Sequence, residues 1–256
     1  CLNSEDDGIR EWGGYFEVNN TYGSVNFVDP TGIQLVPNKT IIDAPASSAL
    51  AYINYQYKDD DMAQIEQTKK LPVTLLQDPV YLKRLDCLTT TLPEETKTVS
   101  IYSLGERDAL VWGNNKYLIL APTILLKKGT TSENLSTELL NHRLTLYYLS
   151  AEGDEDANTL KLYLRYEISG IGGSSTEETD DKESWASDYN VRYTNVSHVN
   201  LQPIISMYKS THSGSEPEKV TVEYEYNNST SSIPTIAKKQ TKPVTYNLYT
   251  ETSSNN

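Results

Sequence analysis

The chain has 256 residues and a net charge of −13, which arises from 35 acidic and 22 basic side chains. A chain this acidic repels phosphate backbones, so nucleic acid is excluded as an expected partner. Two cysteines are too few for a disulfide-rich scaffold, and no apolar run has the length of a membrane-spanning helix.

The first residues, CLNSEDDGIR, resemble the start of a processed bacterial lipoprotein. In such proteins a signal peptide is removed directly before a cysteine, which is then acylated. We therefore expect Cys1 to be a lipidation site that anchors the chain to the outer membrane; an arbitrary start of the chain is the alternative interpretation. The acidic stretch of Ser4, Glu5, Asp6 and Asp7 resembles the surface-export signal of lipoproteins in gut Gram-negative bacteria, which predicts exposure at the cell surface. Residues 1–11 are predicted to form the tether.

The N-terminal third contains short apolar segments that are typical of β-strands, separated by Gly, Pro, Asn and Asp. These segments are GGYFEV, YGSVNFVD, ALAYINYQY, LPVTLLQ and PVYLKRL. The segment MAQIEQTKK is a weaker helix candidate that could equally be a hairpin loop. The stretch TTTLPEETKT, residues 89–98, is polar and lacks apolar periodicity, so it is the predicted boundary between two domains.

The rest of the chain alternates between apolar and polar residues with a period of two. In TLKLYLRYEI the leucines share one face while Lys161 and Arg165 share the other, and in VTVEYEYN the polar face carries Glu223 and Glu225. Such strands bury one face and expose the other, which is typical of antiparallel sheets. The best helix candidate is the short segment TSENLSTELLNHRL, with Ser132 as its cap. The fold class predicted from these patterns is all-β with little helix.

Two further features are compositional. Residues 169–184, SGIGGSSTEETDDKES, are rich in Gly, Ser, Thr and acids and are predicted to form a mobile loop inside the second domain. The chain has 19 tyrosines against two phenylalanines. Tyrosine suits half-buried strand surfaces, and an aromatic platform for sugars or peptides is the alternative interpretation.

The sequence offers little catalytic chemistry. His142, His198 and His212 have no metal-ligand spacing, and we expect each at the surface or at a strand edge. Cys87 lies between apolar residues and is predicted to be a small buried hydrophobe. The glycines near residue 172 are followed by acids, which disfavours a phosphate-binding loop. No catalytic, cofactor-binding or metal-binding residue is therefore predicted.

Four segments together resemble one known family. These are the turn Asp29–Gly32, then KYLILAPTILLKKG, HRLTLYYLSAE and NTLKLYLRYE. Their order is similar to that of the NigD-like bacterial lipoproteins. The resemblance implies a small OB-like barrel over residues 12–90 and an antiparallel β-sandwich over residues 98–250. Two departures occur: ALAYINYQY lacks the arginine of the family's strand, and Tyr166 replaces a histidine. The family pattern offers no catalytic residues.

Three functions remain open. The first is a non-enzymatic surface lipoprotein that binds or scaffolds, with an unknown protein, peptide or glycan as its ligand. The second is a bacteriocin immunity protein, a role that the family resemblance suggests. The third is a hydrolase that uses a pair of carboxylates, which would require two acids facing each other in a cleft.

Overall fold

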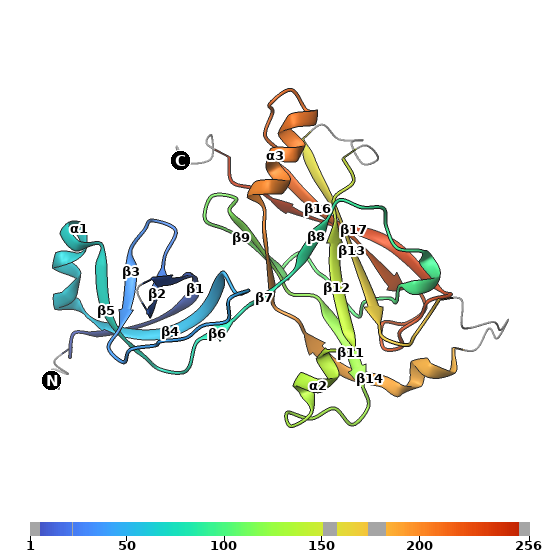
Figure 1. The fold of residues 1–256 in the computed structure, drawn as a ribbon, viewed down its shortest axis with the longest axis horizontal. Coiled ribbons are helices and arrows are strands. Elements are labelled where there is room, and N and C mark those ends of the chain that lie inside the picture. Colours follow the sequence, from blue (N-terminus) through green and yellow to red (C-terminus); the bar gives the residue numbers. More distant parts are fainter. Residues whose placement is uncertain (1–5, 22, 151–157, 174–182, 251–256) are drawn as a thin grey trace, which may run out of the picture. The chain divides into compact units, whose positions relative to one another are not determined.

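The computed structural model describes residues 6–21, 23–150, 158–173 and 183–250. It divides into two compact units, one ending at Arg84 and the other beginning at Leu85. The structure is built mainly from strands, so the all-β prediction with little helix is confirmed (Figure 1). Within the described residues, no helix is both long and apolar enough to cross a membrane.

The N-terminal unit contains a closed five-stranded barrel. Its strands are ordered β1-β2-β3-β5-β4, and β1 also pairs with β4, which closes the ring. All of these pairs are antiparallel except β3 with β5. This is the Greek-key order of an OB-type barrel, as the family resemblance implies. The strands of this unit are β1 (Ile9–Thr21), β2 (Ser24–Val28), β3 (Gln34–Pro37), β4 (Leu50–Lys58), β5 (Lys70–Leu75), β6 (Val80–Tyr81) and β7 (Lys83–Arg84).

The barrel is filled by its own apolar residues, because alternate side chains of each strand point inward. Phe16, Phe27 and Ile53 are among the buried residues of this core. Between β4 and β5 lie the 3₁₀ helix η1 (Asp59–Gln64) and the single turn α1 (Ile65–Thr68). The helix candidate MAQIEQTKK is therefore helical, although in two short pieces.

The barrel begins earlier than the sequence predicts. Strand β1 starts at Ile9, which pairs with Lys58 of β4. Arg10 forms ion pairs with Asp6 at 2.6 Å and with Asp59 at 3.0 Å. The predicted tether of residues 1–11 is thus too long, because its last three residues belong to the barrel.

The C-terminal unit has one large sheet and two smaller ones around a shared core. The large sheet has the order β17-β16-β13-β12-β8. A second sheet contains β15, β10 and β9, and a third pairs β11 with β14. The strands are β8 (Asp86–Leu88), β9 (Ala109–Trp112), β10 (Tyr117–Leu120), β11 (Thr123–Lys127), β12 (His142–Tyr147), β13 (Thr159–Ile168), β14 (Tyr189–Thr194), β15 (Ser197–Asn200), β16 (Lys219–Asn227) and β17 (Lys239–Asn247).

Two pairings of the large sheet are parallel, namely β13 with β16 and β12 with β8. Alternation along one strand does not reveal the direction of its neighbour, so the sequence predicted only antiparallel pairs. A parallel pair needs a long crossover connection. Between β13 and β16 this connection includes β14, β15 and α3 (Gln202–Thr211).

The division between the units lies before the predicted boundary of residues 89–98. Strand β8 already pairs with β12 of the second unit. Residues 98–101 are buried and run between the ends of β13 and β16, where Val99 N–H donates to Tyr166 and Ile101 N–H donates to the Glu225 carbonyl, each over 2.8 Å. This stretch is therefore part of the second unit's core, which its polar composition did not reveal.

The helices also differ in part from the prediction. Helix α2 (Leu135–Leu139) lies in the predicted segment, but its N-cap is Asn134 rather than Ser132. Helix α3 was not predicted, although Pro203 stands in its first turn and it buries Ile204 and Tyr208 at a spacing of four. The 3₁₀ helices η2 (Glu95–Lys97) and η3 (Ser184–Asp188) complete the unit. The predicted mobile loop of 169–184 falls mostly on residues 174–182, which lie outside the described residues.

Candidate functional site

The strongest cluster of charged groups lies on one face of β13, β16 and β17. The parallel register places Tyr163 opposite Glu223, so Lys161 and Arg165 flank Glu223 on the same face. In the antiparallel pair of β16 with β17, Lys239 lies opposite Asn227 and Thr241 lies opposite Glu225. Lys239 and Thr241 are two positions apart, so they share one face of β17. The alternation in the sequence predicts this polar face, and from it we expect the face to be exposed to solvent.

The five charged side chains form a chain of ion pairs. Glu223 binds Lys161 at 3.3 Å and Arg165 at 2.8 Å. Glu225 lies 3.8 Å from Arg165 Nε through Oε1 and 3.2 Å from Lys239 Nζ through Oε2. The side chains of Arg165, Glu225 and Lys239 are each less than a tenth exposed. Such burial is tolerated only where charges are paired.

Lys239 also holds the segment that covers this face. Its ammonium donates to the backbone carbonyls of Glu95 at 2.5 Å and Thr98 at 2.6 Å, and it contacts the Thr98 hydroxyl. Burial lowers the pKa of Lys239, while the nearby carboxylates of Glu225 and Glu95 act in the opposite direction. With Glu225 included, four acceptors surround three N–H groups, so the ammonium has no proton left for a further partner.

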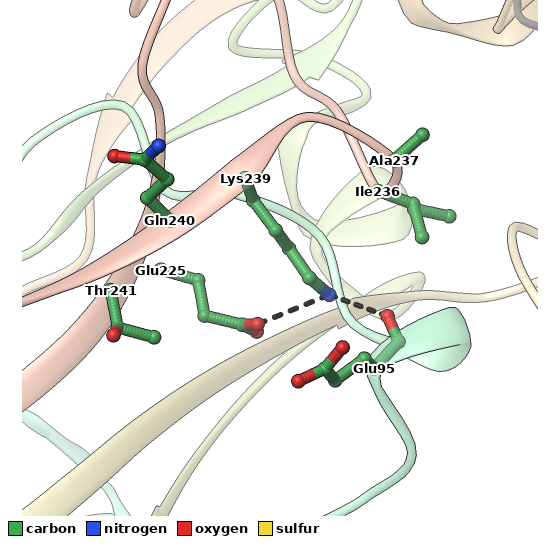
Figure 2. A pocket seen from close by; sticks show the side chains of 7 residues that line it. All are labelled: Glu95, Glu225, Ile236, Ala237, Lys239, Gln240 and Thr241. Atoms are coloured by element: carbon green, nitrogen blue, oxygen red, sulfur yellow. Dashed lines mark hydrogen bonds and ion pairs between the residues drawn. The ribbon is translucent and has the colours of Figure 1, made fainter.

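A hollow of about 450 Å³ adjoins this cluster. We call it the Glu225 hollow; it is lined by Glu95, Glu225, Ile236, Ala237, Lys239, Gln240 and Thr241. Figure 2 shows the carboxylates of Glu95 and Glu225 near the Lys239 ammonium, with Ile236 on another wall. The hollow therefore combines two acids, one saturated cation and the apolar side chains of Ile236 and Ala237.

One oxygen of Glu225 stands out. Glu225 Oε1 is buried and has no hydrogen-bond partner among the described residues. A buried charged acceptor without a donor costs free energy, and such groups in native proteins call for an explanation. Arg165 Nε lies 3.8 Å from this oxygen, which is an ion-pair distance but too long for a hydrogen bond.

Two contacts position the walls of the hollow. Glu183 Oε1 accepts hydrogen bonds from the backbone N–H groups of Ile236 at 2.6 Å and Ala237 at 2.8 Å. Gly172 approaches the carbonyl of Thr96 so closely that a Cβ atom there would lie 2.6 Å from its oxygen. Glu183 and Gly172, which do not line the hollow, thus hold residues 236–237 and 95–97 in place.

Two of the three histidines are buried, which the sequence does not predict. The side chain of His142 is about 1% exposed; its ring contacts Glu138 at 2.7 Å and the Tyr166 hydroxyl at 2.5 Å. His198 is also buried, so the surface prediction is wrong for both. His212 is half-buried and stacks on Tyr208 at the end of α3. His142 links α2 to β12 and β13, which gives it a structural role.

Cys87 lies in β8 and packs partly buried against the core. Burial raises the pKa of its thiol to about 12. This agrees with the predicted inert, small apolar side chain, because the thiolate is the reactive form.

The residues predicted for anchoring and export are only partly described. Cys1, Ser4 and Glu5 lie outside the described residues. Asp6 accepts hydrogen bonds from Gly8 N–H and Arg10, and Asp7 accepts one from Ile9 N–H at 3.1 Å. Asp6 and Asp7 therefore also hold the start of β1, a role that the sequence analysis did not assign to them.

The sequence analysis did not single out Glu95, Lys239 or Glu225 as site residues. Glu225 was placed on a polar strand face, and this was the available signal. Glu95 lies in residues 89–98, which the sequence predicts to be the boundary between two domains. Lys239 lies in β17, and the sequence does not predict the pairing of this strand with β16. Their proximity depends on contacts between distant parts of the chain.

Comparisons with known proteins identify solved structures that share this fold. No protein-family model and no curated protein matches the chain. A structure described as a "Putative lipoprotein" from Bacteroides fragilis matches with a TM-score of 0.69 and 22% identity, over 94% of this chain and 99% of its own. An uncharacterized protein from Parabacteroides merdae matches with a TM-score of 0.55 and 15% identity, over 93% of this chain and 100% of its own.

A more distant match is a NigD-like immunity protein from Bacteroides caccae, with a TM-score of 0.47 and 12% identity, over 89% of this chain and 92% of its own. At these identities a likeness concerns the fold alone. The chain thus shares its fold with the Bacteroides fragilis and Parabacteroides merdae structures.

Proposed function

We propose that this chain is a non-enzymatic lipoprotein, anchored at the cell surface, whose C-terminal unit binds a polar ligand in the Glu225 hollow. The observation that carries the binding role is Glu225, which lines the hollow and whose buried Oε1 has no hydrogen-bond donor among the described residues. A ligand with hydrogen-bond donors would gain free energy from the acidic side chains that line the hollow.

The geometry favours binding over catalysis. The Lys239 ammonium is saturated by Glu225, Glu95 and Thr98, so it is a poor nucleophile or proton donor. A carboxylate pair that hydrolyses glycosides needs one acid that can give up a proton. Glu225 is instead engaged in ion pairs with Arg165 and Lys239.

Two observations support the anchor. The residues CLNSEDD combine a cysteine with the acidic stretch of a surface-export signal. The Bacteroides fragilis neighbour, which shares the fold over 94% of this chain, is itself described as a "Putative lipoprotein". Acyl chains on Cys1 would attach the chain to the outer membrane, and the barrel would follow after the few residues before Ile9.

Equilibrium dialysis of the full chain against a mixture of neutral oligosaccharides and short peptides tests binding and catalysis together. We expect one class of ligand to be enriched on the protein side and to be recovered with its mass unchanged. Fragments that accumulate with time would show that the chain is an enzyme and would overturn the proposal. The absence of any enriched ligand would overturn the binding role.

A further inference from the structure

We propose that one face of the barrel, formed by Trp12, Tyr55 and Tyr57, docks a basic peptide whose lysine or arginine side chains pack on these rings. We call it the Trp12 face. It belongs to the N-terminal unit and is separate from the Glu225 hollow, which none of the three rings lines. The inference is carried by an exposed indole, by the strand register that brings the rings together and by the excess of carboxylates around them.

The pairing of β1 with β4 places the three rings on one face. Trp12 lies directly opposite Tyr55, and directly opposite residues of an antiparallel pair share a face. Tyr57 follows Tyr55 at a spacing of two, and the centroids of their rings are 6.3 Å apart. Tyr55 also packs edge-to-face against Phe16 of the barrel core, with centroids 5.7 Å apart. The core thus positions Tyr55, and the register places Trp12 beside it.

The Trp12 ring is open to a ligand. Trp12 is 63% exposed, whereas Trp112 is 6% exposed, and tryptophan is mostly buried in folded proteins. Within the part of the chain that the structure describes, no aromatic or cationic side chain stacks on Trp12. An indole is the best aromatic partner for a cation, and tryptophan and tyrosine are enriched at the centres of protein interfaces. A cationic side chain of a partner can therefore pack on this ring.

Carboxylates outnumber cations at one end of the Trp12 face. Arg10 lies directly opposite Tyr57, so it shares the face. Asp6 pairs with Arg10 at 2.6 Å and Asp59 pairs with it at 3.0 Å, so two carboxylates surround one guanidinium. The three side chains are between 43% and 61% exposed. A ligand can therefore reach the carboxylate charge that Arg10 leaves unbalanced.

A third carboxylate acts on the face from the end of β2. Burial is the main cause that raises the pKa of Tyr55, followed by Tyr57 and then by the negative charge of Asp29, which directly follows β2. Three acids thus act on the face against one base, and this field attracts a cation. A nucleic acid, an anionic membrane surface or a second copy of this chain, whose net charge is −13, would be repelled.

The spacing of the rings favours an extended peptide over a single small cation. Tyr55 and Tyr57 are alternate residues of one strand, so their attachment points are about 6.8 Å apart along it. Alternate side chains of an extended peptide have the same spacing. A peptide with basic residues at alternate positions can therefore contact neighbouring rings of the face at once.

Two pairs of variants separate the contribution of the indole from that of the charge. Trp12→Ala removes the exposed ring, and Tyr249→Ala is its control, because Tyr249 is a 40% exposed aromatic residue of the C-terminal unit. Asp59→Asn removes one carboxylate of the face. Its control is Glu133→Gln, which makes the same change of charge at an exposed position of the C-terminal unit. Thermal unfolding checks that each variant is folded; if Asp59→Asn is not, Trp12→Ala decides.

The experiment is isothermal titration calorimetry of the full chain with hexapeptides that alternate lysine or arginine with glycine and have blocked ends. The lysine hexapeptide with acetylated side chains has the same backbone without the charges. We expect a basic hexapeptide to bind, with an affinity that falls at least about threefold between 50 mM and 500 mM NaCl, and the acetylated form to show no binding. Trp12→Ala should weaken binding roughly tenfold and Asp59→Asn about threefold, while both controls should bind as the parent chain does.

Four results would overturn the inference: no binding of either basic hexapeptide, equal binding of the acetylated form, an affinity that salt does not change, or equal affinities of Trp12→Ala and Tyr249→Ala. A neutral tetrasaccharide that binds the parent chain but not Trp12→Ala, while the basic peptides fail, would show a saccharide platform and would also overturn it. Repeating the dialysis experiment with Trp12→Ala keeps the two proposals apart, because a ligand of the Glu225 hollow should still be enriched.

Discussion

Lys239 and Glu95 lie 144 positions apart in the chain, and the Lys239 ammonium donates a hydrogen bond to the Glu95 carbonyl oxygen over 2.5 Å. The same ammonium reaches the carbonyl of Thr98 and the carboxylate of Glu225. One side chain on β17 thus ties the covering segment to the sheet and completes the ion pairs beneath it. Substitution of Lys239 therefore tests how much the free energy of unfolding depends on these contacts.

We expect Lys239→Met to lower the free energy of unfolding by about 3 kcal/mol, because it leaves a buried carboxylate and two carbonyls without their cation. Lys238→Met is the control, since Lys238 is exposed and exposed substitutions usually change stability by less than about 0.5 kcal/mol. Urea denaturation of both variants measures the difference. Equal stabilities would contradict the role assigned to Lys239.

Gly172 and Gly170 provide a matched pair at the other side of the covering segment. Both have a positive φ, of +82° and +77°, but only Gly172 lies against the Thr96 carbonyl. We expect Gly170→Ala to cost about 1 kcal/mol from its left-handed backbone alone. Gly172→Ala should cost about 1–3 kcal/mol more, because its Cβ must displace residues 95–97. Denaturation curves that coincide for the two variants would argue against close packing at Gly172.

Glu138 should make the protein sensitive to acid. Burial raises the pKa of Glu138, but hydrogen bonds from His142 and from the backbone N–H of Lys127 lower it, and the net shift is downward. The unfolded chain therefore binds the proton more tightly than the folded chain does. The stability from this group is present above the ordinary pKa of 4.5 and is lost as the pH falls through the lower folded value.

The variant Glu138→Gln should consequently show a smaller loss of stability between pH 5 and pH 2.5 than the parent chain. Glu133→Gln serves as the control and should follow the parent, because Glu133 is an exposed acid in the turn just before α2. Thermal midpoints across this pH range provide the measurement. A Glu138→Gln profile that is parallel to the parent's would exclude a role for this carboxylate.

The Cys87 thiol should be inert in the folded protein. Its pKa of about 12 leaves little thiolate at pH 8, so we expect iodoacetamide to label it at least about a hundredfold more slowly than in the unfolded chain. The experiment uses Cys1→Ser so that Cys87 is the remaining cysteine, and mass spectrometry follows the label. Equal rates with and without urea would show that the thiol is accessible and acidic.

Of the two cysteines, Cys1 is predicted to attach the chain to the membrane and Cys87 is not. Cys1→Ser in the full-length precursor should release the protein from the membrane fraction and leave its thermal midpoint unchanged, because acyl chains on Cys1 would provide the anchor. Cys87→Ser, the control, should remain with the membranes. Sedimentation of a Cys1→Ser protein with the membrane fraction would be evidence against lipidation at this position.

The acidic stretch is tested by replacing Glu5, Asp6 and Asp7 with alanine. The chain should stay lipidated and become less accessible to protease added outside the cells. Arg10→Ala separates export from folding, because it breaks the ion pairs with Asp6 and Asp59 and keeps the acids. If Arg10→Ala is protected to the same extent as the triple variant, the acids act through the start of β1.

The sequence by itself determined the strand content and the faces of individual strands. The alternation in β13 and β16 placed Lys161, Arg165, Glu223 and Glu225 on polar faces, as the structure has them. This information is local, because successive side chains of a strand point to opposite sides whatever the neighbours are. The order of the apolar segments likewise led to the barrel and the sandwich through a family resemblance.

Only the tertiary structure decided which polar faces are buried and what meets on them. The parallel pairing of β13 with β16, the insertion of residues 98–101 between their ends and the reach of Lys239 to Glu95 all join segments that are distant in the chain. The burial of His142 against Glu138 and Tyr166 has the same origin. A local pattern specifies neither the partner of a strand nor the segment that covers it, so a face that the sequence marks as solvated became the wall of the Glu225 hollow.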